Sequence, residues 1–222
     1  MSQIGLVGLG LATGACGSDG TAATSSNDDM LDVPASCVLS PRDPAGPYFL
    51  ETGLNRSDIT EGRAGVPLEV RLQLVDVDAG CEPIPGAALE IWHCDADGIY
   101  SGFDVAEGNL ANAGGETFLR GFQETDRNGR VAFQTIYPGW YPIRTIHIHA
   151  KGLIGGVEEV TTQLYFDQVV NDQVVARPPY DTRGPQPTRN ENDVFDIAGK
   201  TFALEERGDG YVASYLIGIS RA

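Results

Sequence analysis

Hydrophobic and polar residues alternate in several short runs along the chain, and this pattern constrains the fold more than any other feature. In residues 67–76 (PLEVRLQLVD), leucine or valine occupies every second position from 68 to 74. Because successive side chains of a strand point to opposite faces, this period predicts a strand with one buried face. No long stretch has the 3.6-residue period of an amphipathic helix, so the sequence predicts an all-β protein.

The predicted strands are short, and glycine, proline, asparagine and aspartate separate them. They cover residues 67–76, 86–93, 117–125, 130–136, 145–152, 160–166 and 211–219. Residues 167–193 contain several Pro, Asn and Asp, and we expect them to form a long ordered loop. Short strands joined by such turns are typical of a single-domain β-sandwich or barrel, here with long loops.

Residues 1–30 differ from the rest of the chain. An apolar run at residues 4–15 ends in Thr-Gly-Ala before Cys16, and a stretch rich in Gly, Ser, Thr and Asp follows. This order resembles an export signal with a lipoprotein-type processing site, where Cys16 would be the lipid anchor, followed by a flexible spacer. Because no Lys or Arg precedes the apolar run, a terminus without a targeting role is the alternative.

Residues 31–222 are expected to form one β domain. No later apolar run reaches the roughly 18 residues of a membrane-spanning helix, so we expect no transmembrane span. The protein is therefore expected in the cell envelope, the periplasm or the extracellular space, with membrane attachment only through a lipid on Cys16.

The chain is strongly acidic, because 15 Lys+Arg oppose 31 Asp+Glu and the formal net charge is −16. Residues 1–30 contain three aspartates and no basic residue, so most of the acid excess belongs to residues 31–222. Nucleic acids and anionic membrane surfaces are bound mainly by Lys and Arg. The charge therefore excludes both as partners.

Three cysteines, Cys37, Cys81 and Cys94, follow residue 30, and an exported protein permits a disulfide. If residues 79–85 form a hairpin turn, Cys94 lies about nine residues along the next strand, roughly 30 Å from Cys81 at ~3.3 Å per residue. A disulfide needs Cα atoms within about 7 Å. We therefore expect Cys37 to pair with Cys81 or Cys94.

Two of the three histidines, His147 and His149, are two residues apart in a predicted strand. This spacing places both imidazoles on one face and the neighbouring Ile146 and Ile148 on the other. Imidazole binds Zn, Cu, Fe and Ni, so the pair predicts a metal site. The simpler alternative is a pair of hydrogen-bonded or exposed strand histidines.

Cysteine and carboxylate ligands are missing from the sequence around this pair. No Asp or Glu lies between Gln134 and Lys151, and the cysteines do not have metal-site spacing. Tyr100 and Tyr141 remain as oxygen donors. Because free tyrosine has a pKa of about 10, a phenolate ligand needs a strong Lewis acid, and Fe(III) meets that need.

A set of motifs lies between residues 46 and 166. It comprises Gly46-Pro47-Tyr48, residues 88–103 (ALEIWHCDADGIYSGF), 118–121, 126–129 and 136–144, His147-Ile148-His149 and Thr161-Thr162-Gln163. In this combination the chain resembles the intradiol ring-cleavage dioxygenases, the family of catechol 1,2-dioxygenase and protocatechuate 3,4-dioxygenase.

The resemblance implies a β-sandwich in which Tyr100, Tyr141, His147 and His149 bind a non-haem Fe(III). It also implies that both atoms of O2 are inserted into a catechol-type aromatic diol, which gives a muconate-type diacid. In this reaction Tyr141 would leave the metal and take up a substrate proton.

The same resemblance assigns roles around the metal. Arg144 would stabilise negative charge on the substrate, and Gln163 would orient Arg144. Tyr137, which precedes Pro138, is expected to pack in the core. His93 is expected to be a structural hydrogen-bonding residue.

The substrate pocket is expected to include Tyr48, Trp140 and Ile143. The acidity of the chain favours neutral catechols over acidic diols such as protocatechuate. The helical dimerisation region of the catechol enzymes has no counterpart before residue 67, so the oligomeric state stays open.

Two other classes of protein fit parts of the pattern. One is a non-catalytic exported β-sandwich module that binds polysaccharide or protein, which has no need of the two tyrosines and two histidines. The other is a protein that binds Zn or Cu through His147 and His149 without redox chemistry. Metal content and the visible spectrum distinguish both from the dioxygenase.

Overall fold

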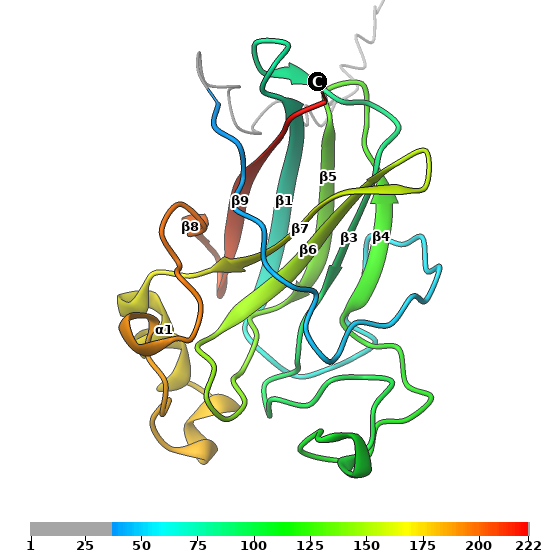
Figure 1. Cartoon of the computed structure of the whole chain (residues 1–222). Coiled ribbons are helices and arrows are strands. Elements are labelled where there is room, and N and C mark those ends of the chain that lie inside the picture. Colours follow the sequence, from blue (N-terminus) through cyan, green and yellow to red (C-terminus); the bar gives the residue numbers. More distant parts are fainter. Residues whose placement is uncertain (1–36, 222) are drawn as a thin grey trace, which may run out of the picture.

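A computed structural model describes residues 37–221, so the predicted export signal, Cys16 and the spacer lie outside the described residues. The described part forms nine strands in two sheets, with one α-helix and three short 3-10 helices between them (Figure 1). No helix in this part of the chain is long and apolar enough to span a membrane. The all-β prediction is confirmed.

The first sheet is built around β1 (Pro67–Asp76). The strands β5 (Arg130–Ile136) and β2 (Glu82–Pro83) pair with β1 in antiparallel orientation, and β9 (Gly210–Ile219) pairs with it in parallel. An antiparallel strand, β8 (Ala203–Arg207), pairs with β9 and completes the sheet.

The second sheet has the order β4-β3-β6-β7 and is antiparallel throughout. Its strands are β3 (Ala88–Trp92), β4 (Arg120–Glu124), β6 (His147–Ile154) and β7 (Val157–Tyr165). In Figure 1, β6 and β7 cross in front of the strands of the first sheet.

The main hydrophobic core contains residues from both sheets. The first sheet contributes the alternating residues of β1, as the sequence pattern predicts, and the second sheet contributes apolar residues of β3 and β6. They include Leu68, Val70, Leu72, Leu74, Leu89, Ile91, Ile148 and Ala150. One face of each sheet is therefore buried against the other, and the outer face of the second sheet is left for other segments to cover.

The chain before β1 covers this outer face. In Figure 1 the segment from residue 37, drawn in blue and cyan, crosses the second sheet. Asn55 forms a bridge to Phe122 of β4, and the Phe49 ring packs against Trp92 at a centroid distance of 4.9 Å. A disulfide between Cys37 and Cys81 ties the start of this segment to the turn after β1, with Cα atoms 5.8 Å apart. The prediction for Cys37 is confirmed, and Cys94 is a buried free cysteine.

The prediction of a loop at residues 167–193 is wrong in part, because it contains α1 (Gln168–Val175) as well as the 3-10 turns η2 (Tyr180–Arg183) and η3 (Asn190–Asn192). The Asp167 side chain accepts a hydrogen bond from the backbone N–H of Val169 and caps the helix. Four valines in eight residues give this segment low helix propensity, which hid the helix.

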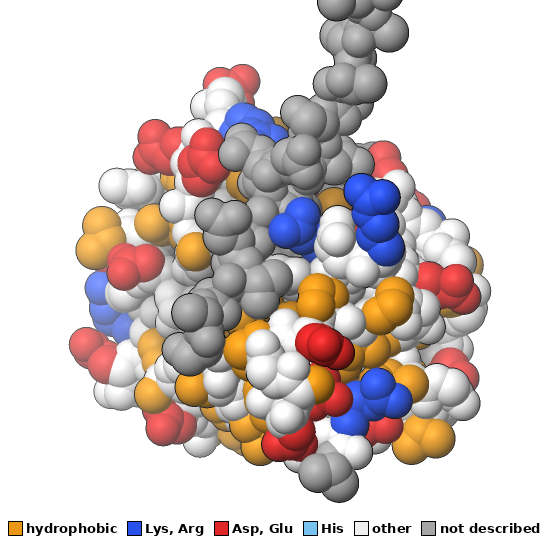
Figure 2. Space-filling view, turned by 90° about the horizontal axis from the view of Figure 1, so that it is seen from above, with side chains coloured by type: hydrophobic (Ala, Val, Ile, Leu, Met, Phe, Trp, Pro, Cys, Tyr) orange, Lys and Arg blue, Asp and Glu red, His pale blue; other side chains and the backbone are white. Residues whose placement is uncertain are grey.

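The strands β2 and β8 were also not predicted from the sequence. The first has only two residues, and the second is mostly exposed and lacks an alternating pattern. The remaining 3-10 turn, η1 (Val105–Glu107), lies in the loop between β3 and β4. Seen from above in Figure 2, Asp and Glu side chains are spread over the surface with Lys and Arg among them.

Candidate metal centre

The strand β6 places His147 and His149 on the outer face of the second sheet. Ile148 lies between them and points into the main core, so the predicted alternation is confirmed. Both histidines are 2% exposed, and their Nε2 atoms are 3.1 Å apart. Gly46 passes so close that a Cβ at this position would lie 3.3 Å from Cε1 of His149, and its φ of +77° also requires glycine.

The protonation state of the histidine pair suits a metal ligand. Nδ1 of His147 donates to the carbonyl oxygen of Thr145 at 2.7 Å. Since a carbonyl oxygen only accepts, Nε2 of a neutral His147 carries the lone pair. Burial lowers the pKa of His147 to about 3, and burial together with the neighbouring His147 lowers the pKa of His149 well below its ordinary value. Both rings are therefore neutral at physiological pH, the form that binds metals.

Tyr100 reaches the same place from the loop after β3. The side chain of Asn109 fixes its backbone by accepting from its N–H at 3.1 Å and donating to its carbonyl oxygen at 2.8 Å. The Tyr48 ring stacks on the Tyr100 ring at a centroid distance of 4.5 Å. The Tyr100 hydroxyl is fully buried and has no hydrogen-bond partner among the described residues. A buried hydroxyl without a partner is costly unless a ligand engages it.

Tyr141 lies in the loop before β6. Its hydroxyl is 3.4 Å from Nε2 of His147, and its ring centroid is 5.6 Å from that of Tyr100. Burial raises the pKa of Tyr141 to about 12 and the pKa of Tyr100 well above its ordinary value. Both hydroxyls therefore keep their protons at neutral pH unless a nearby cation favours the phenolates.

The structure thus brings together the four residues that the sequence predicts as ligands. Within residues 37–221, no group of three or more His, Cys, Asp and Glu side chains is placed to hold a metal ion. The donors here are instead two imidazole nitrogens and two phenol oxygens. This donor set, with the orphaned Tyr100 hydroxyl, fits a strongly Lewis-acidic ion with mixed nitrogen and oxygen ligation.

Arg144 lies beside the four donors and is almost fully buried. Its Nη1 is 3.4 Å from the Tyr141 hydroxyl, and its Nη2 donates to Oε1 of Gln163 and, at 3.2 Å, to the hydroxyl of Tyr165. Its Nε forms an ion pair with Asp193 at 3.0 Å. Burial alone lowers the pKa of Arg144, but the hydrogen bonds and charge of Asp193 raise it above its ordinary value. The guanidinium is therefore charged.

Two residues of this site were missed by the sequence analysis. Tyr165 lies two residues after Gln163 and pairs with His147 in the sheet register, so the strand period alone could have placed it on the histidine face. Asp193 is 49 residues from Arg144, in a segment without periodicity, and no local pattern indicates it.

The three residues that were expected to line the substrate pocket lie in different environments. Tyr48 lies against Tyr100, and its hydroxyl donates to the carbonyl oxygen of Gly108 at 2.6 Å. Trp140 packs in the main core with the guanidinium of Arg183 4.1 Å above its ring. Ile143 is 71% exposed. Of the three, only Tyr48 packs directly against one of the four donors.

The two residues left out of the metal set lie elsewhere. His93 is buried and bonds through Nδ1 to the carbonyl oxygen of Cys94 and through Nε2 to Oγ1 of Thr135. Tyr137 belongs to the main core, where its hydroxyl donates to the side chain of Asn171 at 2.7 Å. Both are structural residues, as predicted.

Comparison with known proteins agrees with this architecture. A family model described as "Dioxygenase" matches residues 45–186. The solved intradiol ring-cleavage dioxygenase from Tetranychus urticae is 35% identical, and the match covers 83% of this chain and 95% of that chain at a TM-score of 0.76. The dioxygenase domain of a dioxygenase–carbohydrate-binding protein fusion from Streptomyces sp. SirexAA-E is 27% identical, with coverages of 83% and 100% and a TM-score of 0.62. The chain belongs to the intradiol ring-cleavage dioxygenase family.

Curated relatives match over shorter stretches. Hydroxyquinol 1,2-dioxygenase of Corynebacterium glutamicum is 33% identical over 101 residues, which cover 44% of this chain and 30% of that protein. Chlorocatechol 1,2-dioxygenase of Pseudomonas putida is 31% identical over 145 residues, which cover 55% of this chain and 52% of that protein. The chain therefore spans about half or less of the length of these relatives.

Proposed function

We propose that this chain is an intradiol dioxygenase in which Tyr100, Tyr141, His147 and His149 hold one non-haem Fe(III). The reaction would insert both atoms of O2 into a catechol-type aromatic diol and give a muconate-type diacid. The observation that carries this proposal is the convergence of two neutral imidazoles and two buried phenols at one place. Membership of the family supports it.

Bound Fe(III) would supply a Lewis acid that makes a chelated catecholate reactive towards O2. The side chains of the site would control the proton transfers of that reaction. Tyr141 is less buried than Tyr100 and lies beside the charged Arg144. We therefore assign to Tyr141, as the phenolate that bound Fe(III) would favour, the uptake of a proton from the incoming diol on its phenolic oxygen.

Arg144 would act on the charge of the substrate. Its Nη1 faces the Tyr141 hydroxyl, and its other nitrogens are held by protein acceptors. A fixed positive charge in a buried site stabilises negative charge that develops on the aromatic ring, without reorganisation during the reaction. Gln163 supports this role through its bond to Nη2 of Arg144.

The proposed substrate is a neutral catechol rather than an acidic one. The net charge of −16 gives no long-range attraction for a carboxylated diol. Activity with catechol, 4-methylcatechol and hydroxyquinol that exceeds activity with protocatechuate supports this preference. The reverse order would contradict it.

Oxygen uptake by the iron-loaded protein tests the activity. We expect one O2 consumed per diol and a diacid product with at least one of the four diols. The variant Tyr100→Phe should lose activity, while Tyr137→Phe, which removes another buried phenol outside the metal set, should keep it. An iron-replete protein that consumes no O2 with any diol would contradict the proposal. A colourless protein that binds zinc or copper would favour the metal-binding alternative.

We also propose that the protein is exported and carries a lipid on Cys16. The disulfide between Cys37 and Cys81 supports export, because such bonds persist in oxidising compartments. Fractionation of cells that express the full chain tests this proposal. Membrane attachment that is lost in Cys16→Ala supports the lipid anchor, and wild-type protein found only in the cytoplasm contradicts export.

A further inference from the structure

The guanidinium of Arg144 is held from several sides at once. Nε bonds to both carboxylate oxygens of Asp193, at 3.0 and 3.2 Å, and Nη2 bonds to Gln163 and Tyr165. Since a guanidinium is a rigid planar fork, holding Nε and Nη2 sets the direction of the remaining nitrogen. That nitrogen is Nη1, which faces the Tyr141 hydroxyl at 3.4 Å.

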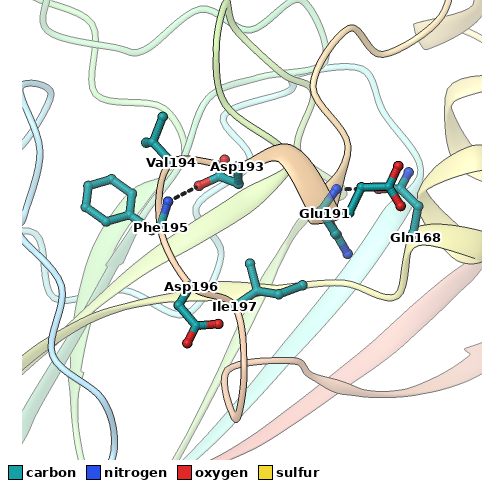
Figure 3. A pocket seen from close by; sticks show the side chains of 8 residues that line it. Gln168, Glu191, Asp193, Val194, Phe195, Asp196 and Ile197 are labelled. Carbon is teal, nitrogen blue, oxygen red and sulfur yellow. Dashed lines mark hydrogen bonds between the residues drawn. The ribbon is translucent and has the colours of Figure 1, made fainter.

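Asp193 is itself tightly held. Its side chain is 0% exposed. Oδ2 accepts from the backbone N–H of Thr145 at 2.7 Å. Oδ1 accepts from the backbone N–H of Phe195 at 3.0 Å, the dashed line beside Asp193 in Figure 3. The Phe195 ring lies 4.7 Å from the guanidinium carbon of Arg144. The carboxylate therefore cannot turn away from Arg144 without breaking two backbone hydrogen bonds.

Gln163 is held in a similar way on the other side of Arg144. Its backbone N–H donates to Oδ2 of Asp43 at 3.2 Å, and Asp43 forms a buried ion pair with Lys200 at 2.6 Å. Gln163 therefore links the Lys200–Asp43 ion pair to the Arg144–Asp193 ion pair. Asp43, Asp193 and Lys200 all lie outside residues 45–186, the part that matches the family model.

We propose that Asp193 is a positioning residue, which directs Nη1 of Arg144 towards the Tyr141 hydroxyl and the diol bound there. This inference rests on the proposed function. The carboxylate would contact neither the metal nor the substrate, and it would act only through the Arg144 guanidinium. The loop that carries it also lines a pocket of about 460 Å3, through Asn190, Glu191 and residues 193–197 (Figure 3).

The variant Asp193→Asn tests the proposal, because it keeps the shape of the side chain and removes its charge. We expect kcat to fall about 10- to 100-fold, as is typical when support for a functional group is lost, with KM little changed. Iron content and the visible absorption band should stay at wild-type values. The matched control is Asp196→Asn, an exposed carboxylate of the same segment that bonds only to the backbone of Ala198. This control should keep wild-type kinetics.

A double-mutant cycle separates positioning from a general structural role. If Asp193 acts through Arg144, Asp193→Asn should cost little further activity in an Arg144→Gln background. An equal loss with and without Arg144, or a wild-type kcat in Asp193→Asn, would overturn the proposal. If Asp193→Asn does not fold, Asp193→Glu keeps the charge and displaces it by one methylene, and the same criteria apply. An inactive wild-type protein would instead count against the proposed function.

Discussion

The two faces of β6 are both buried, but for different reasons. On the inner face, Ile148 and Ala150 are 0% exposed between the two sheets. This burial stabilises the fold by about 25 cal/mol for each Å2 of apolar surface removed from water. On the outer face, His147 and His149 are 2% exposed beneath the loops and the segment before β1. Burying these two imidazoles removes water from their polar nitrogens, so it adds little to the stability of the fold.

The two faces of β6 therefore meet different requirements. The inner face requires apolar side chains of the right volume, and the fold depends on them. The outer face keeps buried polar atoms that have no hydrogen-bond partner within residues 37–221, among them Nδ1 of His149 and the Tyr100 hydroxyl. Folded proteins rarely keep such atoms buried unless they have a use. The outer face is therefore built for chemistry at a cost in stability.

Replacing His149 should have the largest effect on activity. Loss of a metal ligand in His149→Ala should lower kcat by more than the ~100-fold typical of residues that only support a ligand. The free energy of unfolding of the metal-free protein should also fall, because the buried His149 ring stacks on Trp92 at a centroid distance of 4.9 Å, but by less than on truncation of a residue of the main core. Oxygen uptake and urea denaturation measure the two effects. Activity close to wild type would show that His149 does not bind the metal.

The adjacent residue Ile148 should behave in the opposite way. Ile148→Ala should lower the free energy of unfolding by about 2–5 kcal/mol, because it leaves a cavity in the main core. Activity per folded molecule should stay close to wild type. Urea denaturation together with kinetics at low temperature checks both parts. An unchanged stability would mean that the inner face does not carry the fold.

The disulfide between Cys37 and Cys81 sharpens the comparison, because it fastens the segment that covers the outer face. Its two cysteines are 44 residues apart, and a double replacement by serine should cost about 2–4 kcal/mol of stability. Thermal unfolding measures this loss. The variant Cys94→Ala, which removes the buried free cysteine, should cost less. A larger loss of stability in Cys94→Ala than in the double variant would show that the disulfide is not what stabilises this part of the fold.

A smaller effect is expected in the pH dependence of stability. Burial lowers the pKa of His93 to about 4 in the folded state, from about 6.5 in the unfolded chain. Between these values the unfolded chain binds the proton first, so stability falls as pH drops from 6.5 to 4, by about 1 kcal/mol per pH unit. Metal-free His93→Asn should show a shallower dependence in urea denaturation at pH 7, 6 and 5.

Glu90 provides the opposing control. Burial raises its pKa to about 7, so its folded-state proton stabilises the protein at low pH and this contribution is lost as pH rises through 7. The variant Glu90→Gln should therefore make the loss of stability between pH 7 and 5 steeper. Equal slopes in wild type and both variants would contradict the two shifts.

Local patterns carried most of what could be predicted from the sequence. The two-residue period located the strands and put His147 and His149 on one face, and the spacing of the motifs singled out Tyr100 and Tyr141. These features depend on a few neighbouring residues, and the structure brings all four side chains together.

The features that could not be predicted depend on contacts between segments that are far apart in the sequence. Asp193 reaches Arg144 from 49 residues away, and nothing in residues 190–197 indicates a contact with the loop before β6. The helix α1 was hidden by its valines. Trp140 lies in the main core under the guanidinium of Arg183, which is 43 residues further along the chain. The strand period could have placed Tyr165 on the histidine face. Its hydrogen bond with Arg144, which makes it part of the site, is visible only in the structure.

The visible spectrum of the iron-loaded protein tests the central claim most directly. If Tyr100 and Tyr141 bind Fe(III) as phenolates, the protein with one iron per chain should be red-brown from tyrosinate-to-iron charge transfer. The band should change in Tyr100→Phe and in Tyr141→Phe, and disappear when both are replaced. A colourless protein that holds its iron, or a band that survives the double replacement, would contradict the account.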